Sequence, residues 1–174
     1  MGLAIVASRA RTGLAAPPVS VEVHLSGGLP AFTIVGLPAA AVRESKDRVR
    51  AALLCCRFDY PVSRIIVNLA PADLPKEGGR FDLPIALGIL AASGQLPTRT
   101  LQGREFIGEL SLDGAVRPVN GALSAAVATR DAGRSLVLPV ANGPEAALVD
   151  ELRARTAADL AGVCEHLRGG TPLP

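Results

Sequence analysis

The sequence predicts an α+β domain in which helices pack on a mixed β-sheet as a two-layer sandwich. Three observations predict this fold class. A period-two alternation of apolar and polar residues runs through residues 19–26, a helical period occupies residues 39–57, and strand-like and helix-like segments alternate beyond residue 60. With 174 residues, 49% of them apolar, the chain is long enough for one domain with a substantial core.

The first three predicted elements are strands at residues 3–10, 19–26 and 31–38. In the second strand, Val21 and Val23 face one side and the polar residues, including His24, face the other, which is typical of a half-buried strand. Because the three strands follow one another closely, we expect an antiparallel meander.

The middle of the chain alternates between helix and strand. Residues 39–57 place Val42, Val49 and Leu53 at helical spacing, and residues 63–71 return to a strand. Residues 82–93 are apolar nearly all round, which predicts a helix buried on most sides.

The last third adds smaller elements. Asp113-Gly114 between two apolar segments is a strong signal for a hairpin. Beyond it we expect helices at 122–133, 143–150 and 156–170 and a strand at 135–140. The domain is thus predicted to span residues 1–169, with residues 170–174 beginning a linker.

Composition excludes several classes of protein. Aromatic residues are 3% of the chain, with no Trp and only Tyr60 as tyrosine, so base stacking has few platforms. The net charge of +2 does not by itself imply a polyanionic partner. Cys55, Cys56 and Cys164 have no disulfide or metal-ligand spacing, and we interpret them as buried thiols in a reducing compartment. No secretory signal and no apolar run of membrane-spanning length is present in this sequence, so we expect a cytoplasmic protein without membrane contact.

One stretch combines a strand, a glycine-rich polar turn and a buried helix: NLAPADLPKEGGRFDLPIALGIL, residues 68–90. This order is found where a phosphate is cradled or a nucleophile is presented, and also in ordinary turns. The P-loop pattern G-x-x-x-x-G-K-[ST] has no match, which argues against nucleotide binding. His24 and His166 are isolated, so no metal site is expected. Glu77 and Asp82 fit either acid–base chemistry or a local charge network.

Residues 43–80 are moderately basic, with eight Lys or Arg against five Asp or Glu. Such a surplus supports phosphate contacts on one face, although an ordinary solvated helix face has the same composition.

A resemblance makes the stretch more specific. Residues 19–53, 67–90 (VNLAPADLPKEGGRFDLPIALGIL) and 107–126 (IGELSLDGAVRPVNGALSAA) closely resemble the N-terminal domain of the magnesium-chelatase-like AAA+ ATPases, the competence protein ComM or YifB family. The likeness covers residues 2–169. That domain is similar to the proteolytic domain of Lon protease and to the C-terminal domain of the repair protein RadA, which implies an α+β fold that is also found in a ribosomal protein.

The same resemblance implies that the turn is not catalytic. Lon proteases have P-K-D-G-P-S here, ending in the nucleophilic serine, whereas this chain reads P-K-E-G-G-R and places Arg80 at that position. Leu123 stands where the catalytic lysine of Lon would be. A missing nucleophile cannot be activated. The turn residues are therefore expected to be structural or to form an interface: Lys76, Glu77, Gly78, Gly79, Arg80 and Asp82.

The resemblance also implies a function. It predicts a non-catalytic domain of a hexameric AAA+ ATPase, a branch-migration helicase of natural transformation and recombination, whose ATP and Mg²⁺ are held by an AAA+ module outside these residues. This chain itself is expected to bind no cofactor. It is expected to support ring assembly and to contact DNA weakly, through phosphates, with these candidate cations: Lys76, Arg80, Arg43, Lys46 and Arg50.

Two alternatives stay open. One is a divergent peptidase whose nucleophile is Ser111 or Ser124. The other is a pure assembly module without DNA contact.

Overall fold

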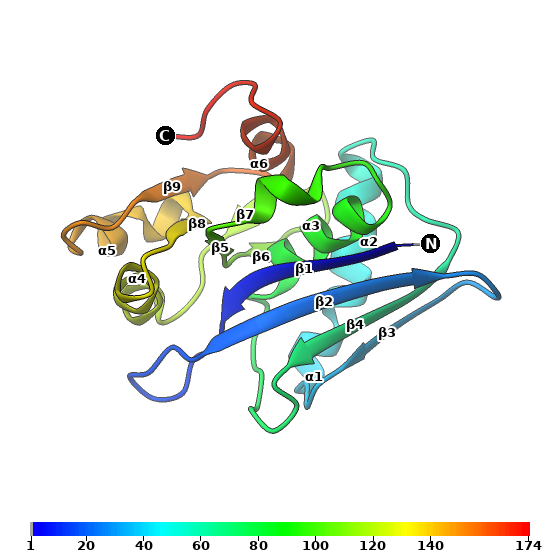
Figure 1. Ribbon diagram of the computed structural model, residues 1–174, viewed down its shortest axis with the longest axis horizontal. Coiled ribbons are helices and arrows are strands. Elements are labelled where there is room, and N and C mark those ends of the chain that lie inside the picture. Colours follow the sequence, from blue (N-terminus) through cyan, green and yellow to red (C-terminus); the bar gives the residue numbers. More distant parts are fainter. Residues whose placement is uncertain (1) are drawn as a thin grey trace.

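The computed structural model describes residues 2–174 and contains a seven-stranded mixed sheet with helices packed against it (Figure 1). This confirms the predicted α+β fold class. From one edge of the sheet to the other, the strands are β3 (Ala31–Val35), β4 (Arg64–Ala70), β2 (Pro18–Ser26), β1 (Gly2–Arg9), β5 (Arg104–Phe106), β8 (Ser135–Pro139) and β9 (Ala154–Ala157).

The predicted antiparallel meander of the first three strands is wrong in one respect. β1 and β2 form an antiparallel pair, with Val6 opposite Val21, but β3 does not pair with β2. Instead β4 lies between them, antiparallel to β2 and parallel to β3. In this position the buried residues of β4 lie directly opposite the buried residues of β2, as Val67 does opposite Val23. β5, β8 and β9 continue the sheet in parallel.

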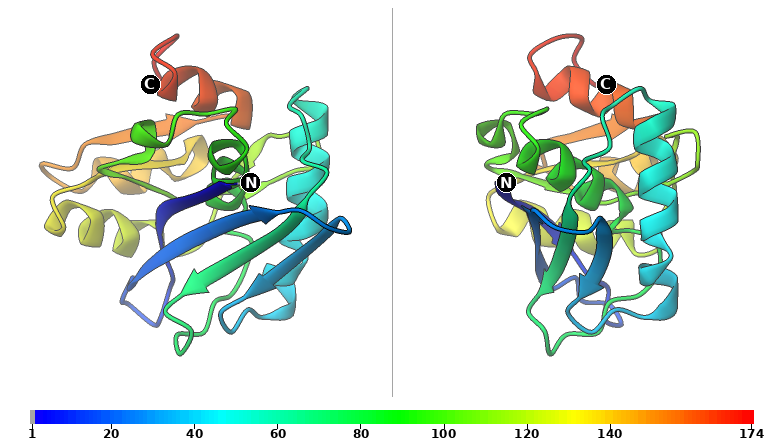
Figure 2. Two further views of the ribbon diagram at one scale, coloured as in Figure 1. Left: turned by 45° about the vertical axis from the view of Figure 1, so that its right-hand side comes forward. Right: turned by 90° about the vertical axis from the view of Figure 1, so that its right-hand side faces the viewer.

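The helices over β1–β4 lie on one side of the sheet, as the side view in Figure 2 shows. They are α1 (Ala40–Arg43), α2 (Ser45–Cys55) and α3 (Asp82–Ala92). Every residue of α3 from Asp82 to Ala91 is buried, which confirms the prediction from its all-round apolar sequence. Gly88 lets α3 approach the sheet closely, because a Cβ there would collide with the side chain of Val23.

The other end of the sheet departs from a simple two-layer arrangement. The side chains of β8 point alternately to two clusters: Val137 joins the main core, whereas Leu136 and Leu138 join a second cluster. That second cluster is built with α4 (Ala122–Asp131) and with α5 (Gly143–Ala147), so helices cover both faces of the sheet here. The remaining elements are α6 (Leu160–Leu167), the 3-10 helices η1 (Thr98–Leu101) and η2 (Val140–Asn142), and a separate hairpin of β6 (Glu109–Leu110) and β7 (Val116–Arg117).

The hairpin confirms the turn predicted at Asp113-Gly114, whereas β9 was not anticipated. The end of the chain packs back on the fold: Leu173 is buried, and the Thr156 amide donates to the Pro174 carbonyl. Of the three cysteines only Cys164 is buried, while Cys55 is exposed, so the interpretation of all three as buried thiols is corrected.

In the part of the chain that the structure describes, residues 2–174, no helix is long and apolar enough to cross a membrane.

Candidate functional site: the glycine turn and the arginine strip

The turn before α3 is fastened to the strand-like segment that leads into β6. The Gly108 amide donates to the Arg80 carbonyl and the Leu83 amide donates to the Gly108 carbonyl, both at 3.0 Å. Gly78 has a φ of 75°, a left-handed conformation that favours glycine. The end of the turn that leads into α3 is therefore held in place by backbone hydrogen bonds.

Lys76 points inward from this turn. The side chain is fully buried, and the ammonium donates to the carbonyls of Gly36, at 2.6 Å, and Pro71. Burial lowers the pKa of this ammonium, and the nearby carboxylate of Asp73 opposes the shift. Lys76 therefore joins three loop segments of the fold. This corrects the expectation that its ammonium is available to a phosphate.

Asp82 also points inward and is fully buried. Its carboxylate accepts hydrogen bonds from the Ser45 hydroxyl, from the Leu110 amide at 3.0 Å, and from Arg48 through Nε at 2.6 Å and Nη2 at 3.1 Å. The bond to Asp82 raises the pKa of Arg48. Of the two interpretations of Asp82, the local charge network is the one that this geometry supports.

Arg80 faces a cavity, which we call the turn pocket. Its volume is about 270 Å³, and its walls are Arg11, Glu77, Gly78, Gly79, Arg80, Glu109, Pro118, Val119 and Asn120. Arg80 is 5% exposed and donates from Nη2 to the Asn120 carbonyl at 2.7 Å. Its buried Nε has no hydrogen-bond partner within residues 2–174. Burial, and secondly the charge of Arg11, lowers the pKa of Arg80 to about 10.

The turn pocket contains neither of the alternative nucleophiles. The Ser111 hydroxyl donates to the Asp113 carboxylate at 2.5 Å, and Ser124 lies on α4; neither lines the pocket. Leu123, which the resemblance aligns with the catalytic lysine of Lon, is 42% exposed and does not line it either.

The other predicted cations lie apart from the turn pocket. Arg43 is exposed on α1, Lys46 is half-buried on α2, and Arg50 is exposed and stacks 5.4 Å above the ring of Tyr60. None of them lines the turn pocket. The structure therefore separates the predicted set into a turn group and a helix group.

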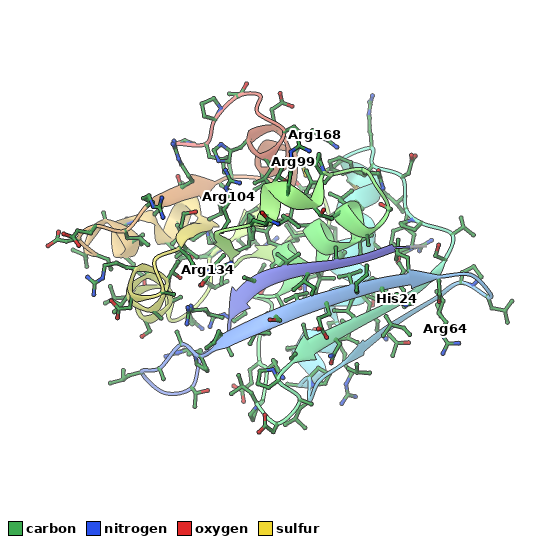
Figure 3. The ribbon with its side chains drawn as sticks, in the orientation of Figure 1. His24, Arg64, Arg99, Arg104, Arg134 and Arg168 are labelled. Atoms are coloured by element: carbon green, nitrogen blue, oxygen red, sulfur yellow. The ribbon has the colours of Figure 1, made fainter. Side chains whose placement is uncertain are left out.

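A second cationic surface was not predicted from the sequence. Figure 3 shows Arg168, Arg99, Arg104 and Arg134 in a row, from the end of α6 across η1 and β5 to the start of β8. We call these four residues the arginine strip. Arg64 and His24 lie apart from this row, on the right of the same view, on β4 and β2.

The guanidinium groups of the arginine strip bond mainly to carbonyls. Arg104 donates to the Thr100 carbonyl at 2.5 Å, and Arg168 donates to the Gln95 carbonyl at 2.5 Å. Within residues 2–174, Arg134 alone of the four has a carboxylate within ion-pair distance, that of Glu105 at 3.1 Å. The Glu105 carboxylate also pairs with Arg9, whose Nε lies 2.7 Å from Oε1, so one carboxylate is paired with two guanidinium groups.

The positive charge of this surface also acts on a neighbouring histidine. Burial lowers the pKa of His166, and the charges of Arg104 and Arg155 lower it further. The strip is thus cationic, and three of its members, Arg104, Arg134 and Arg168, are held by hydrogen bonds or an ion pair, while Arg99 is exposed. Its members are spread over 70 residues of sequence and come together only when η1, β5, β8 and α6 meet, which is why no linear cluster revealed it.

Among residues 2–174, no group of three or more His, Cys, Asp or Glu side chains is placed to hold a metal ion.

Comparison with known proteins identifies a matching family and several relatives of the chain. The family described as subunit ChlI of Mg-chelatase matches residues 21–142. The competence protein ComM of Haemophilus influenzae is 53% identical over 174 residues, which is 100% of this chain and 34% of that protein. The uncharacterized protein YifB of Escherichia coli is 48% identical over 169 residues, 97% of this chain and 33% of that protein. This chain thus spans about a third of the length of these relatives.

A more distant relative is a protease. Lon protease 2 of Thermus thermophilus is 28% identical over 152 residues, 78% of this chain and 18% of that protein. Together with the matches that extend over the whole chain, these similarities show that this protein belongs to the magnesium-chelatase-like family that includes ComM and YifB.

Proposed function

We propose that this chain is the non-catalytic N-terminal domain of a ComM-type AAA+ ATPase and that it contacts the phosphate backbone of DNA through the arginine strip. The arrangement of the strip is the observation that carries the proposal. Its four guanidinium groups lie in a row and are opposed by a single shared carboxylate within residues 2–174. A row of cations suits the regularly spaced charges of a nucleic-acid backbone.

The contact is to phosphates rather than to bases. The strip carries no aromatic side chain, and the one aromatic contact of its members stacks Arg168 on Phe58, at 5.7 Å. Without stacking platforms, binding is insensitive to sequence and strongly dependent on salt. One domain with a few contacts binds in the non-specific range of about 10⁻⁴–10⁻⁶ M.

In the parent protein, ATP hydrolysis with Mg²⁺ takes place in the AAA+ module, and this domain supports assembly of a hexameric ring. Six strips in one ring raise the effective concentration of phosphate contacts, so the ring binds DNA tightly although each domain binds it weakly. On this proposal the parent drives DNA branch migration in natural transformation and recombination. The relative ComM is named a competence protein, which supports the proposal.

The test is DNA binding by this chain as a function of salt. We expect Arg99→Gln combined with Arg168→Gln to weaken binding and to make the slope of log K against log salt shallower by about two units, one for each phosphate that is no longer neutralised. The matched control is Arg43→Gln with Arg50→Gln, which removes the same charge from α1 and α2. If only the control pair changes the slope, DNA meets the helix face and not the strip.

A second measurement separates DNA contact from assembly. In a full-length family member carrying the Arg99 and Arg168 substitutions, hexamers are expected to persist while DNA affinity falls. Loss of hexamers with unchanged DNA affinity would support the pure assembly module instead. Neither peptide cleavage nor ATP hydrolysis is expected from this chain, and turnover that disappears on replacing Ser111 or Ser124 would support the peptidase alternative.

A further inference from the structure

The turn pocket contains a buried cation whose charge is not matched. Arg80 is 5% exposed, and the hydrogen bond from its Nη2 goes to a neutral carbonyl, that of Asn120. Its Nε is buried without a partner within residues 2–174. A buried charge without a counter-charge is costly, and proteins normally pair it.

A second guanidinium adds to this positive charge. Arg11 lines the same pocket, and its Cδ lies 2.8 Å from the place where a Cβ on Gly121 would be. Gly121, with a φ of 74°, therefore gives room for Arg11 beside Asn120. Within residues 2–174, neither Arg11 nor Arg80 forms an ion pair.

Two carboxylates, those of Glu77 and Glu109, also line the pocket, and within residues 2–174 neither forms an ion pair with Arg11 or Arg80. Glu109 lies against Gly79, where a Cβ would overlap its carboxylate, and its charge acts on Arg48, whose pKa it helps to raise. Glu77 is exposed. Of the charged side chains that line the pocket, Arg11 is the one whose charge shifts the pKa of Arg80, so the two guanidinium groups act on each other without a compensating carboxylate.

We propose that the turn pocket binds one small oxyanion of the phosphate class between Arg11 and Arg80. Two guanidinium groups offer several fixed N–H donors, which match the oxygens of a phosphate. The volume of about 270 Å³ admits such a group with water, and no aromatic side chain lines the pocket to hold a base. The chemistry fits free phosphate or the terminal phosphate of a nucleotide. This inference is independent of DNA binding at the arginine strip.

The experiment is a phosphate titration of this chain at constant ionic strength, balanced with NaCl, followed by isothermal calorimetry and by the melting temperature. We expect saturable binding and a rise in melting temperature that chloride does not reproduce. Arg11→Gln is the main variant, because Arg11 is exposed and its replacement leaves the core intact. It is expected to weaken phosphate binding at least tenfold. Arg43→Gln removes an exposed charge outside the pocket and is expected to bind phosphate as the unsubstituted chain does.

The melting temperature of the Arg11→Gln variant without phosphate gives a second test. In phosphate-free buffer, Arg11→Gln removes the repulsion on Arg80, so its melting temperature is expected to equal or exceed that of the unsubstituted chain. A lower melting temperature together with unchanged phosphate affinity would show that Arg11 is structural and would overturn the proposal. Absence of saturable phosphate binding in the unsubstituted chain would overturn it as well.

Two further arms identify the source of the anion and the location of the site. A deoxynucleoside 5′-monophosphate that binds as tightly as phosphate indicates a nucleotide terminus, whereas binding of phosphate alone indicates the free anion. The Arg99 and Arg168 double variant is expected to retain phosphate binding. If that variant loses phosphate binding while Arg11→Gln keeps it, the anion sits on the strip and the pocket proposal fails.

Discussion

Arg48 contacts two carboxylates that differ in burial, and this permits a controlled prediction. Asp82 is fully buried and receives two hydrogen bonds from Arg48, whereas Glu44 is 69% exposed and lies 3.6 Å from the same guanidinium. We predict that Asp82→Asn costs about 3 kcal/mol of unfolding free energy, while Glu44→Gln costs about 0.5 kcal/mol or less.

The magnitude follows from the exposure of the partner that is left behind. Removing one member of a buried ion pair typically costs about 3–5 kcal/mol, because the other charge stays buried and unpaired. The side chain of Arg48 is 20% exposed, so water partly solvates its charge and the lower end applies. An asparagine keeps one acceptor oxygen, and the donors that compete for it include the Ser45 hydroxyl and the Leu110 amide.

Urea denaturation followed by circular dichroism measures the effect. With a slope of about 2 kcal/mol per molar urea, 3 kcal/mol moves the midpoint by about 1.5 M. Arg48→Gln and the double variant complete a cycle that isolates the coupling between the two side chains. If Asp82→Asn and Glu44→Gln lowered stability equally, the argument that burial decides the energy of this pair would be refuted.

Three further predictions concern packing and the thiols. Leu87→Ala is expected to cost about 2–5 kcal/mol in urea denaturation, because Leu87 is fully buried in α3; a cost under about 0.5 kcal/mol would contradict the layer assignment. Gly88→Ala is expected to cost about 1–3 kcal/mol through overpacking against Val23, and Val23→Ala in the same chain is expected to restore part of that stability. Burial raises the pKa of the Cys164 thiol to about 12, so this thiol is protonated at pH 8. At that pH iodoacetamide is expected to label exposed Cys55 first and Cys164 only on unfolding, as read by mass spectrometry, and equal rates would contradict the burial.

Local patterns predicted the elements of this fold better than their pairing. The alternation in β2 and the all-round apolar sequence of α3 both reflect burial of the element itself, and both were confirmed. The insertion of β4 between β2 and β3 depends on contacts between residues far apart in the sequence, so proximity along the chain predicted the wrong order. β9 is a short strand with the sequence ARTA, whose apolar and polar residues carry no clear signal without β8 beside it.

The candidate site, too, was predicted only as far as local sequence determines it. The sequence identified the turn, but it did not reveal that Lys76 and Asp82 point inward while Arg80 faces the turn pocket. The direction of each side chain depends on which backbone carbonyls and amides approach the turn, and those come from residues 36, 71, 110 and 120. Arg11 lies 69 residues before Arg80, so no spacing rule could join them.

The inward direction of Lys76 has a practical consequence for chemical labelling. Lys46 and Lys76 are the only lysines of this sequence, and most of its cationic side chains are arginines. Because the Lys76 ammonium is buried and bonded to two carbonyls, amine-reactive cross-linkers and acetylating reagents have one accessible lysine in the folded domain, Lys46. Amine-directed cross-links made through the lysines of this domain would therefore report the neighbourhood of α2, and mapping the arginine strip requires guanidinium-directed reagents.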